Sequence, residues 1–219
     1  AVDAIVAASF ALAVVEPYHS GLGGGEFTLL RMISDEKVVV CDARESAPSG
    51  ATPNMYINPD TGEPFEDISW RGGLAVGVPG SVQGKVDLIQ KYGNLPLNKV
   101  MAPAIRLAKK GFVVDRSLSS RLKSITDRFS EDAGIAAVFL PDGKAPDRGD
   151  ILVQTKLAKC LEDIAKDNGK SFYFGKMAEH ISNTCQQSGG IITPADMAEY
   201  KVIWREPIRF EYRDYTVYS

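Results

Sequence analysis

Apolar residues follow a helical or an alternating pattern over most of this chain. Residues 1–15 are rich in Ala, Leu and Val on nearly every face, which predicts a buried helix that Pro17 ends. Two β-rich runs follow at residues 26–33 and 37–41, and the polar residues 34–36 between them predict a hairpin. The chain therefore opens with a helix, a glycine-rich turn and a pair of strands.

The pattern becomes mainly helical farther along. A proline-rich loop is expected over residues 46–71, and the small residues 72–80 predict a strand and a turn. Apolar spacing predicts helices at residues 81–92, 97–110, 116–129, 151–167 and 176–187. Thr193 is expected to cap a further helix that begins at Pro194. Two strands at residues 208–212 and 215–218 follow, and the fold class is α/β (α+β) with a helical lobe in its middle.

Composition limits the class of protein. The 219 residues are 44% hydrophobic and 24% charged, as is usual for a globular protein. The net charge of −3 without a basic run argues against nucleic acid as a partner, and no apolar stretch approaches the ~18 residues of a membrane span. The first helix and the last strand both look cut, so we expect residues 1–219 to be a single, incomplete domain, and the compartment stays open.

The three cysteines, Cys41, Cys160 and Cys185, are widely spaced and form no metal-binding pattern. We expect structural, mostly buried thiols, and neither a metal nor a cofactor. The chain also lacks a GxSxG elbow, a catalytic-cysteine signature and an HExxH motif. These residues alone predict no catalytic group.

The glycine-rich segment Gly21–Gly25 has more than one interpretation. Its backbone N–H groups could face an anion, but it runs from helix to strand and lacks the spacing of nucleotide-binding loops. It could equally be a tight turn that packs backbone against a neighbouring sheet, or line a substrate pocket.

Arg44 stands at the end of a predicted strand, between Asp42 and Glu45. It could be a surface arginine that is merely ion-paired, which contributes little. Alternatively its guanidinium fork binds a carboxylate through two parallel hydrogen bonds. Spacing alone leaves both interpretations open.

Seven segments in order resemble the γ-glutamyltranspeptidase family, within the N-terminal-nucleophile hydrolases. They are AVDAIVAASFALAVVEP, SGLGGGEF, DARESAP, GGLAVGVPGSVQG, PAIRLAKKGF, GGIITPADMAEY and YTVYS. The resemblance covers nearly the whole chain and identifies it as most of a large subunit. Glu26 departs from the pattern, because family members often carry glycine or another small residue there.

The resemblance implies a fold, a partner and a reaction. One precursor cleaves itself into a large and a small subunit, which together form a four-layer αββα sandwich. The new N-terminal threonine of the small subunit attacks the γ-glutamyl carbonyl of a donor such as glutathione. Water or an amino acid or peptide then takes the glutamyl group. No cofactor is implied, and a periplasmic or secreted location would follow if a signal peptide has been removed.

The resemblance also implies site residues. Arg44 matches the arginine that binds the α-carboxylate of the glutamyl group. We expect Glu45 to orient it, and Gly23 and Gly24 to support the pocket as close-packed backbone. No catalytic residue is expected in this chain, which should be inactive alone. Two alternatives remain: a family member acting on another acyl bond, such as a glutaryl β-lactam side chain or poly-γ-glutamate, and a non-catalytic scaffold or binding protein.

Overall fold

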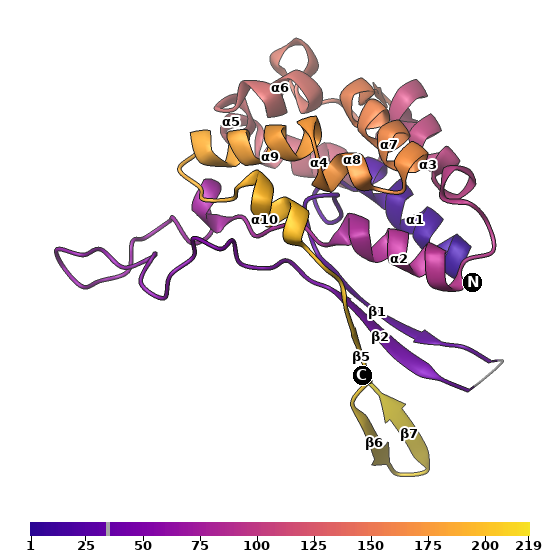
Figure 1. Ribbon diagram of the computed structural model, residues 1–219. Coiled ribbons are helices and arrows are strands. Elements are labelled where there is room, and N and C mark those ends of the chain that lie inside the picture. Colours follow the sequence, from indigo (N-terminus) through magenta and orange to yellow (C-terminus); the bar gives the residue numbers. More distant parts are fainter. Residues whose placement is uncertain (34–35) are drawn as a thin grey trace. The chain divides into compact units, whose positions relative to one another are not determined.

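A computed structural model of the chain describes residues 1–33 and 36–219 (Figure 1). Ser34 and Asp35, which the sequence assigns to the hairpin turn, lie outside the described residues. The chain forms two compact units, one made of residues 1–21 and 93–166 and the other of residues 22–92 and 167–219. The expectation of a single domain stays a prediction, and each unit is described by itself.

The first unit is mainly helical. Its buried centre lies between α1 (Val2–Val15) and α3 (Leu97–Lys110), where Phe10 and Met101 are fully buried. The main-chain carbonyl of Val14 accepts a hydrogen bond from the buried side chain of Gln154 at 2.7 Å. The remaining elements are α4 (Arg116–Ser124), α5 (Thr126–Ser130), α6 (Ala133–Phe139), η2 (Pro141–Gly143), most of α7 (Thr155–Asp167), and the paired strands β3 (Phe112–Val113) and β4 (Ile151–Leu152).

Two helices of this unit differ from their predicted extent. The helix predicted over residues 116–129 is broken at Ile125, whose φ of −123° is not helical, so α4 and α5 are separate. The helix predicted from residue 151 begins only at Thr155, because Ile151 and Leu152 pair with β3. Helical spacing of apolar residues could not reveal this pairing, since the partner strand is about 40 residues away.

The second unit contains a three-stranded antiparallel sheet in the order β1–β2–β5 (Figure 1). Strands β1 (Glu26–Arg31) and β2 (Val38–Ala43) confirm the predicted pair, and β5 (Ile203–Arg205), which the sequence did not reveal, pairs with β2. Helix α2 (Ser81–Tyr92) packs on β2. Cys41 and Ala43 are completely buried on that side.

A long irregular segment joins β2 to α2, as predicted for residues 46–71. The strand predicted within residues 72–80 is wrong, because a 3₁₀ turn, η1 (Gly73–Ala75), occupies it and only Val78 forms a bridge, to Ser46. The other elements are α8 (Lys170–Tyr173), α9 (Lys176–Gln187), α10 (Pro194–Glu199), and the hairpin β6 (Arg209–Tyr212) and β7 (Tyr215–Tyr218).

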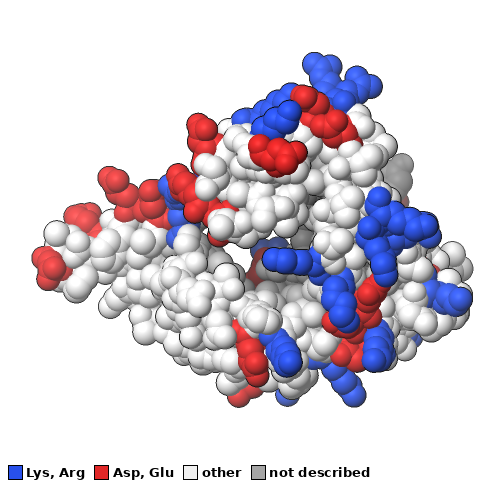
Figure 2. Space-filling view, turned by 90° about the horizontal axis from the view of Figure 1, so that it is seen from above, with Lys and Arg blue, Asp and Glu red and all other residues white. Residues whose placement is uncertain are grey.

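The surface carries both signs of charge. Figure 2 shows Lys and Arg side chains interspersed with Asp and Glu over the face in view, with uncharged areas between them. None of the helices in the described part of the chain has the length and apolar composition needed to cross a membrane.

Thr193 caps α10 as predicted, through a reciprocal arrangement with Asp196. The Thr193 hydroxyl accepts from the Asp196 N–H, and Asp196 Oδ2 accepts from the Thr193 N–H at 2.8 Å. Burial by itself raises the pKa of Asp196, but hydrogen bonds from Ser49 and Thr193 outweigh it and lower the pKa to about 2. The ionised carboxylate therefore stabilises the folded state.

We predict that this stabilisation depends on pH. Because the folded-state pKa lies below the unfolded value of about 4, the contribution of about 2 kcal/mol is present above pH 4 and is lost as the pH falls towards 2. Asp196→Asn should therefore lower the free energy of unfolding in urea at pH 5, and the difference from wild type should shrink towards pH 2. A difference that stays constant over this range would contradict the assignment.

Candidate functional site around Arg44

Arg44 directly follows β2, where the buried part of the strand ends. Its side chain is 52% exposed, and its guanidinium lies 3.1 Å from Glu45 Oε2 and 5.9 Å from the centre of the Phe27 ring. A guanidinium has five N–H donors in a planar fork, so contact with one carboxylate oxygen leaves it capacity for a second carboxylate. The structure thus brings Arg44 and Glu45 together, as the sequence predicts.

Asp42 does not pair with the Arg44 side chain, although it flanks it in sequence. Its Oδ1 accepts the Arg44 main-chain N–H at 3.2 Å, and its Oδ2 accepts from Arg205 Nε at 2.7 Å. Burial opposes ionisation of Asp42, but these hydrogen bonds and the two positive charges lower its pKa. Asp42 therefore fixes the main chain at the strand end, and Arg205 was not recognisable from the sequence because it comes from the distant β5.

The glycine-rich loop packs against this strand end as backbone. The carbonyl of Gly24 accepts N–H groups of Gly80 and Ser81, at the start of α2, at 3.1 and 3.0 Å. A Cβ atom at Gly25 would lie 2.5 Å from Glu45 Oε2 and 2.7 Å from Arg44 Cα. At Gly24 the nearest such atom is Glu45 Oε1 at 3.7 Å, and at Gly23 nothing lies within 4 Å.

The close approach is thus made by Gly25, which sequence reasoning did not single out from its neighbours. The useful signal was its place directly before the strand, next to the partner strand's end. The supporting role of Gly23 and Gly24 in a pocket stays a prediction.

Glu26, the residue that departs from the family pattern, forms a shielded ion pair. Lys85 Nζ lies 2.5 Å from Glu26 Oε2 and also contacts both oxygens of Ser81. The Lys85 side chain is 4% exposed and that of Glu26 is 21% exposed. The charged side chain fits because its neighbours are small: Glu26 is opposite Ala43 in the sheet and next to Gly84 on α2.

The other face of the sheet is open and apolar. The register places Phe27, Leu29 and Ile203 on it, and these side chains are 64%, 47% and 50% exposed. A hollow of about 670 Å³ borders this face, lined in part by Phe27, Leu29 and Asp42. The site of Arg44 therefore lies at one end of an uncovered sheet face.

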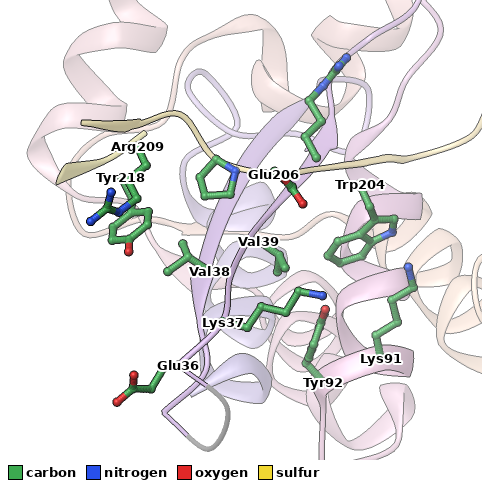
Figure 3. A pocket seen from close by; sticks show the side chains of 12 residues that line it. Glu36, Lys37, Val38, Val39, Lys91, Tyr92, Trp204, Glu206, Arg209 and Tyr218 are labelled. Atoms are coloured by element: carbon green, nitrogen blue, oxygen red, sulfur yellow. The ribbon is translucent and has the colours of Figure 1, made fainter. Parts of the chain in front are cut away.

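A second hollow, of about 580 Å³, lies at the other end of β2 (Figure 3). It begins at Val38, about 17 Å along the strand from Ala43. Its wall is engaged internally, since Lys91 Nζ lies 3.9 Å from the centre of the Trp204 ring and Trp204 Nε1 donates to Asp87 at 3.4 Å. This hollow is separate from Arg44.

The cysteines offer no activated thiol. Cys41 and Cys185 are buried and Cys160 is half-buried, and all three are free. Burial raises the pKa of Cys41 to about 12 and that of Cys160 to about 11, so both thiols are protonated at neutral pH. No group of three or more metal-ligating side chains occurs among the described residues.

Comparison with known proteins gives a consistent family. The family model described as Gamma-glutamyltranspeptidase matches residues 1–219. The chain is 43% identical to the glutathione hydrolase proenzyme of Escherichia coli (strain K12), with 100% of the chain and 38% of that protein covered. It is 37% identical to the Acylase ACY 1 proenzyme of Pseudomonas sp. (strain SE83), with 99% of the chain and 40% of that protein covered.

The γ-glutamyltranspeptidase of Helicobacter pylori superposes with a TM-score of 0.96 at 38% identity, over 100% of this chain and 62% of that one. The expected fold class, mixed α/β of the N-terminal-nucleophile hydrolase type, is confirmed. The chain spans about 38% of the length of the first of these relatives.

We predict that Gly25→Ala is destabilising, because the new Cβ would overlap main-chain atoms of Arg44 and Glu45 that cannot move away freely. Overpacking of this kind costs about 1–3 kcal/mol. Gly23→Ala is the matched control and should change the free energy of unfolding by less than about 0.5 kcal/mol, since its Cβ position is open. Equal effects of the two substitutions in urea unfolding would show that the packing at Gly25 is not tight.

We also predict that Lys85→Met is strongly destabilising, because it leaves the Glu26 carboxylate shielded and unpaired. Removal of one member of such a pair costs about 3 kcal/mol or more, whereas replacing both members by apolar residues is often close to neutral. The double substitution Glu26→Leu/Lys85→Met should therefore recover most of the stability lost in Lys85→Met. A double variant less stable than Lys85→Met in urea would contradict this account.

Proposed function

The chain belongs to the γ-glutamyltranspeptidase family, and on that premise we propose that it is the large-subunit part of an enzyme that cleaves γ-glutamyl amides. The donor would be glutathione or a similar γ-glutamyl compound. The glutamyl group would pass through a γ-glutamyl-enzyme intermediate to water or to an amino acid or peptide.

The observation that carries this proposal is the position of Arg44. Its guanidinium is half-exposed, its main chain is fixed by Asp42, and it contacts only one oxygen of Glu45 among the ion pairs of the described residues. A carboxylate brought to this fork would gain two parallel, charge-assisted hydrogen bonds. Arginine stays charged at any working pH, so donor binding would not depend on its titration. Glu45 would limit the orientations of the fork, and this support is part of the proposal.

The chemical step is assigned to the small subunit. Its N-terminal threonine would attack the γ-carbonyl of the donor with its own α-amine as base, and the amide nitrogen would leave with a proton. Water or an acceptor amine would then attack the acyl-enzyme and restore the threonine. This chain's contribution would be to hold the α-carboxylate so that the γ-carbonyl meets the nucleophile in a reactive geometry.

The open face of the sheet supports the small subunit as partner. Phe27, Leu29 and Ile203 leave a row of apolar surface exposed beside Arg44. A sheet face of this kind is normally buried against another layer. A second sheet laid on it would cover these side chains and bring the partner's residues towards the end of β2.

A second candidate function follows from the relative named an acylase, which is as similar to this chain as several relatives named glutathione hydrolases. The complete protein could hydrolyse a glutaryl amide, which has the same carboxylate spacing but no α-amine. Comparing a γ-glutamyl anilide with a glutaryl anilide separates the two candidates, since each activity should favour its own substrate. A protein that cleaves neither would be a scaffold.

We predict that Arg44→Ala, in the complete protein that carries this chain, raises the KM for a γ-glutamyl anilide by about 30-fold or more. An unpaired carboxylate costs roughly 2–4 kcal/mol, and the accessible position of Arg44 favours the lower end of this range. Arg44→Lys should lie between wild type and Arg44→Ala, because it keeps the charge and loses the fork.

Arg31→Ala is a suitable control, since Arg31 is another exposed arginine that ends the neighbouring strand β1. Its KM should be that of the wild type. If Arg44→Ala bound the donor normally, the role proposed for Arg44 would be wrong.

A further inference from the structure

The short helix α10 and the tyrosine after it hold the segment that carries Arg44. The Tyr200 hydroxyl donates to the main-chain carbonyl of Arg44 at 2.8 Å, and Asp196 Oδ1 accepts the main-chain N–H of Ser49 at 2.8 Å. The two contacts join residues 156 and 147 positions apart in sequence. They fall at the two ends of the segment from Arg44 to Ser49, just where it leaves the sheet.

Asp196 is suited to this task because one carboxylate serves two structures. Its Oδ2 accepts from the main chain and the hydroxyl of Thr193, which closes the first turn of α10, while Oδ1 is used for Ser49. The residue is only 8% exposed. The tie to Ser49 is therefore as rigid as the helix cap itself.

Tyr200 is held equally firmly. Its ring stacks on Tyr173, with ring centres 5.7 Å apart and an interplanar angle of 14°. The Tyr173 hydroxyl donates to the Pro79 carbonyl at 2.9 Å and accepts the Gln83 N–H at 3.1 Å, which anchors it at the start of α2. Gly80 leaves the necessary space, since a Cβ atom there would overlap the Tyr200 hydroxyl and the Ala43 carbonyl.

We propose that Tyr200 and Asp196 are positioning residues, which hold the main chain from Arg44 to Ser49 so that the Arg44 guanidinium stays at the donor carboxylate. This inference rests on the function proposed for Arg44. The guanidinium itself is half-exposed and contacts only Glu45 and Phe27, so its location depends on where the main chain is held. A group that is fixed before the donor binds loses less conformational freedom on binding.

The first test is a double-mutant cycle in the complete protein. Tyr200→Phe removes the hydroxyl and keeps the ring stack, and it should raise the KM for a γ-glutamyl anilide about 5- to 10-fold with kcat within about twofold of wild type. In an Arg44→Ala background the same substitution should change KM less than about twofold, because its effect acts through Arg44.

Tyr56→Phe is the matched control. Tyr56 is also half-buried, and its hydroxyl also donates to a main-chain carbonyl, that of Leu74, at 2.9 Å. Its loss should leave the KM unchanged. An equal rise in KM for Tyr200→Phe with and without Arg44, or no rise at all, would overturn the positioning role.

The second test does not use activity. Amide hydrogen exchange in peptides covering residues 44–49 should become about 10-fold faster in Asp196→Ala and in Tyr200→Phe, and stay unchanged in Tyr56→Phe. Unchanged exchange in both variants would overturn the proposed hold, whatever the kinetics. If Arg44→Ala leaves the KM unaltered, the proposed function fails instead, and the exchange measurement alone decides whether α10 holds this segment.

Discussion

The second unit depends on close backbone packing at the end of β2. Three main-chain segments meet there: the exit of the glycine-rich loop at Gly25, the strand end at Ala43 and Arg44, and the start of α2 at Gly80. They meet at distances that leave no room for side chains. The same absence of side chains gives the Gly24 carbonyl access to the first N–H groups near α2, which would otherwise lack helix partners. Position and direction of Arg44 follow from this packing.

Local pattern predicted much of this arrangement from the sequence. The strands around the hairpin, the helices α2, α3 and α9, and the Thr193 cap each depend on residues close together in the chain, so periodicity and capping chemistry reveal them. The break at Ile125 could not be predicted, because the apolar spacing continues through it. Strand β5 was missed for a different reason: three residues are too few for a visible alternation, and its pairing with β2 spans most of the chain.

The site shows the same division between local and distant information. Arg44 and Glu45 could be identified because they are adjacent, whereas Arg205 and Tyr200 act on the strand end only through the fold. The Glu26–Lys85 pair is an intermediate case. Glu26 stood out as a departure from the family pattern, but its compensating charge lies on α2, one turn from Ser81, and only the structure joins them. Departures of this kind are understood in pairs, since a buried carboxylate requires its cation.

The discontinuity of the second unit has a consequence for synthesis of the chain. Residues 93–166, which belong to the other unit, are made between the strand that carries Arg44 and the residues that hold it. At about 5–20 residues per second, the 156 residues from Arg44 to Tyr200 take on the order of 10 s to translate. Throughout this interval β2 is on the ribosome without β5 beside it, and the first unit can complete its own core. The carboxylate-binding end of the sheet is therefore among the last parts of the nascent chain to mature.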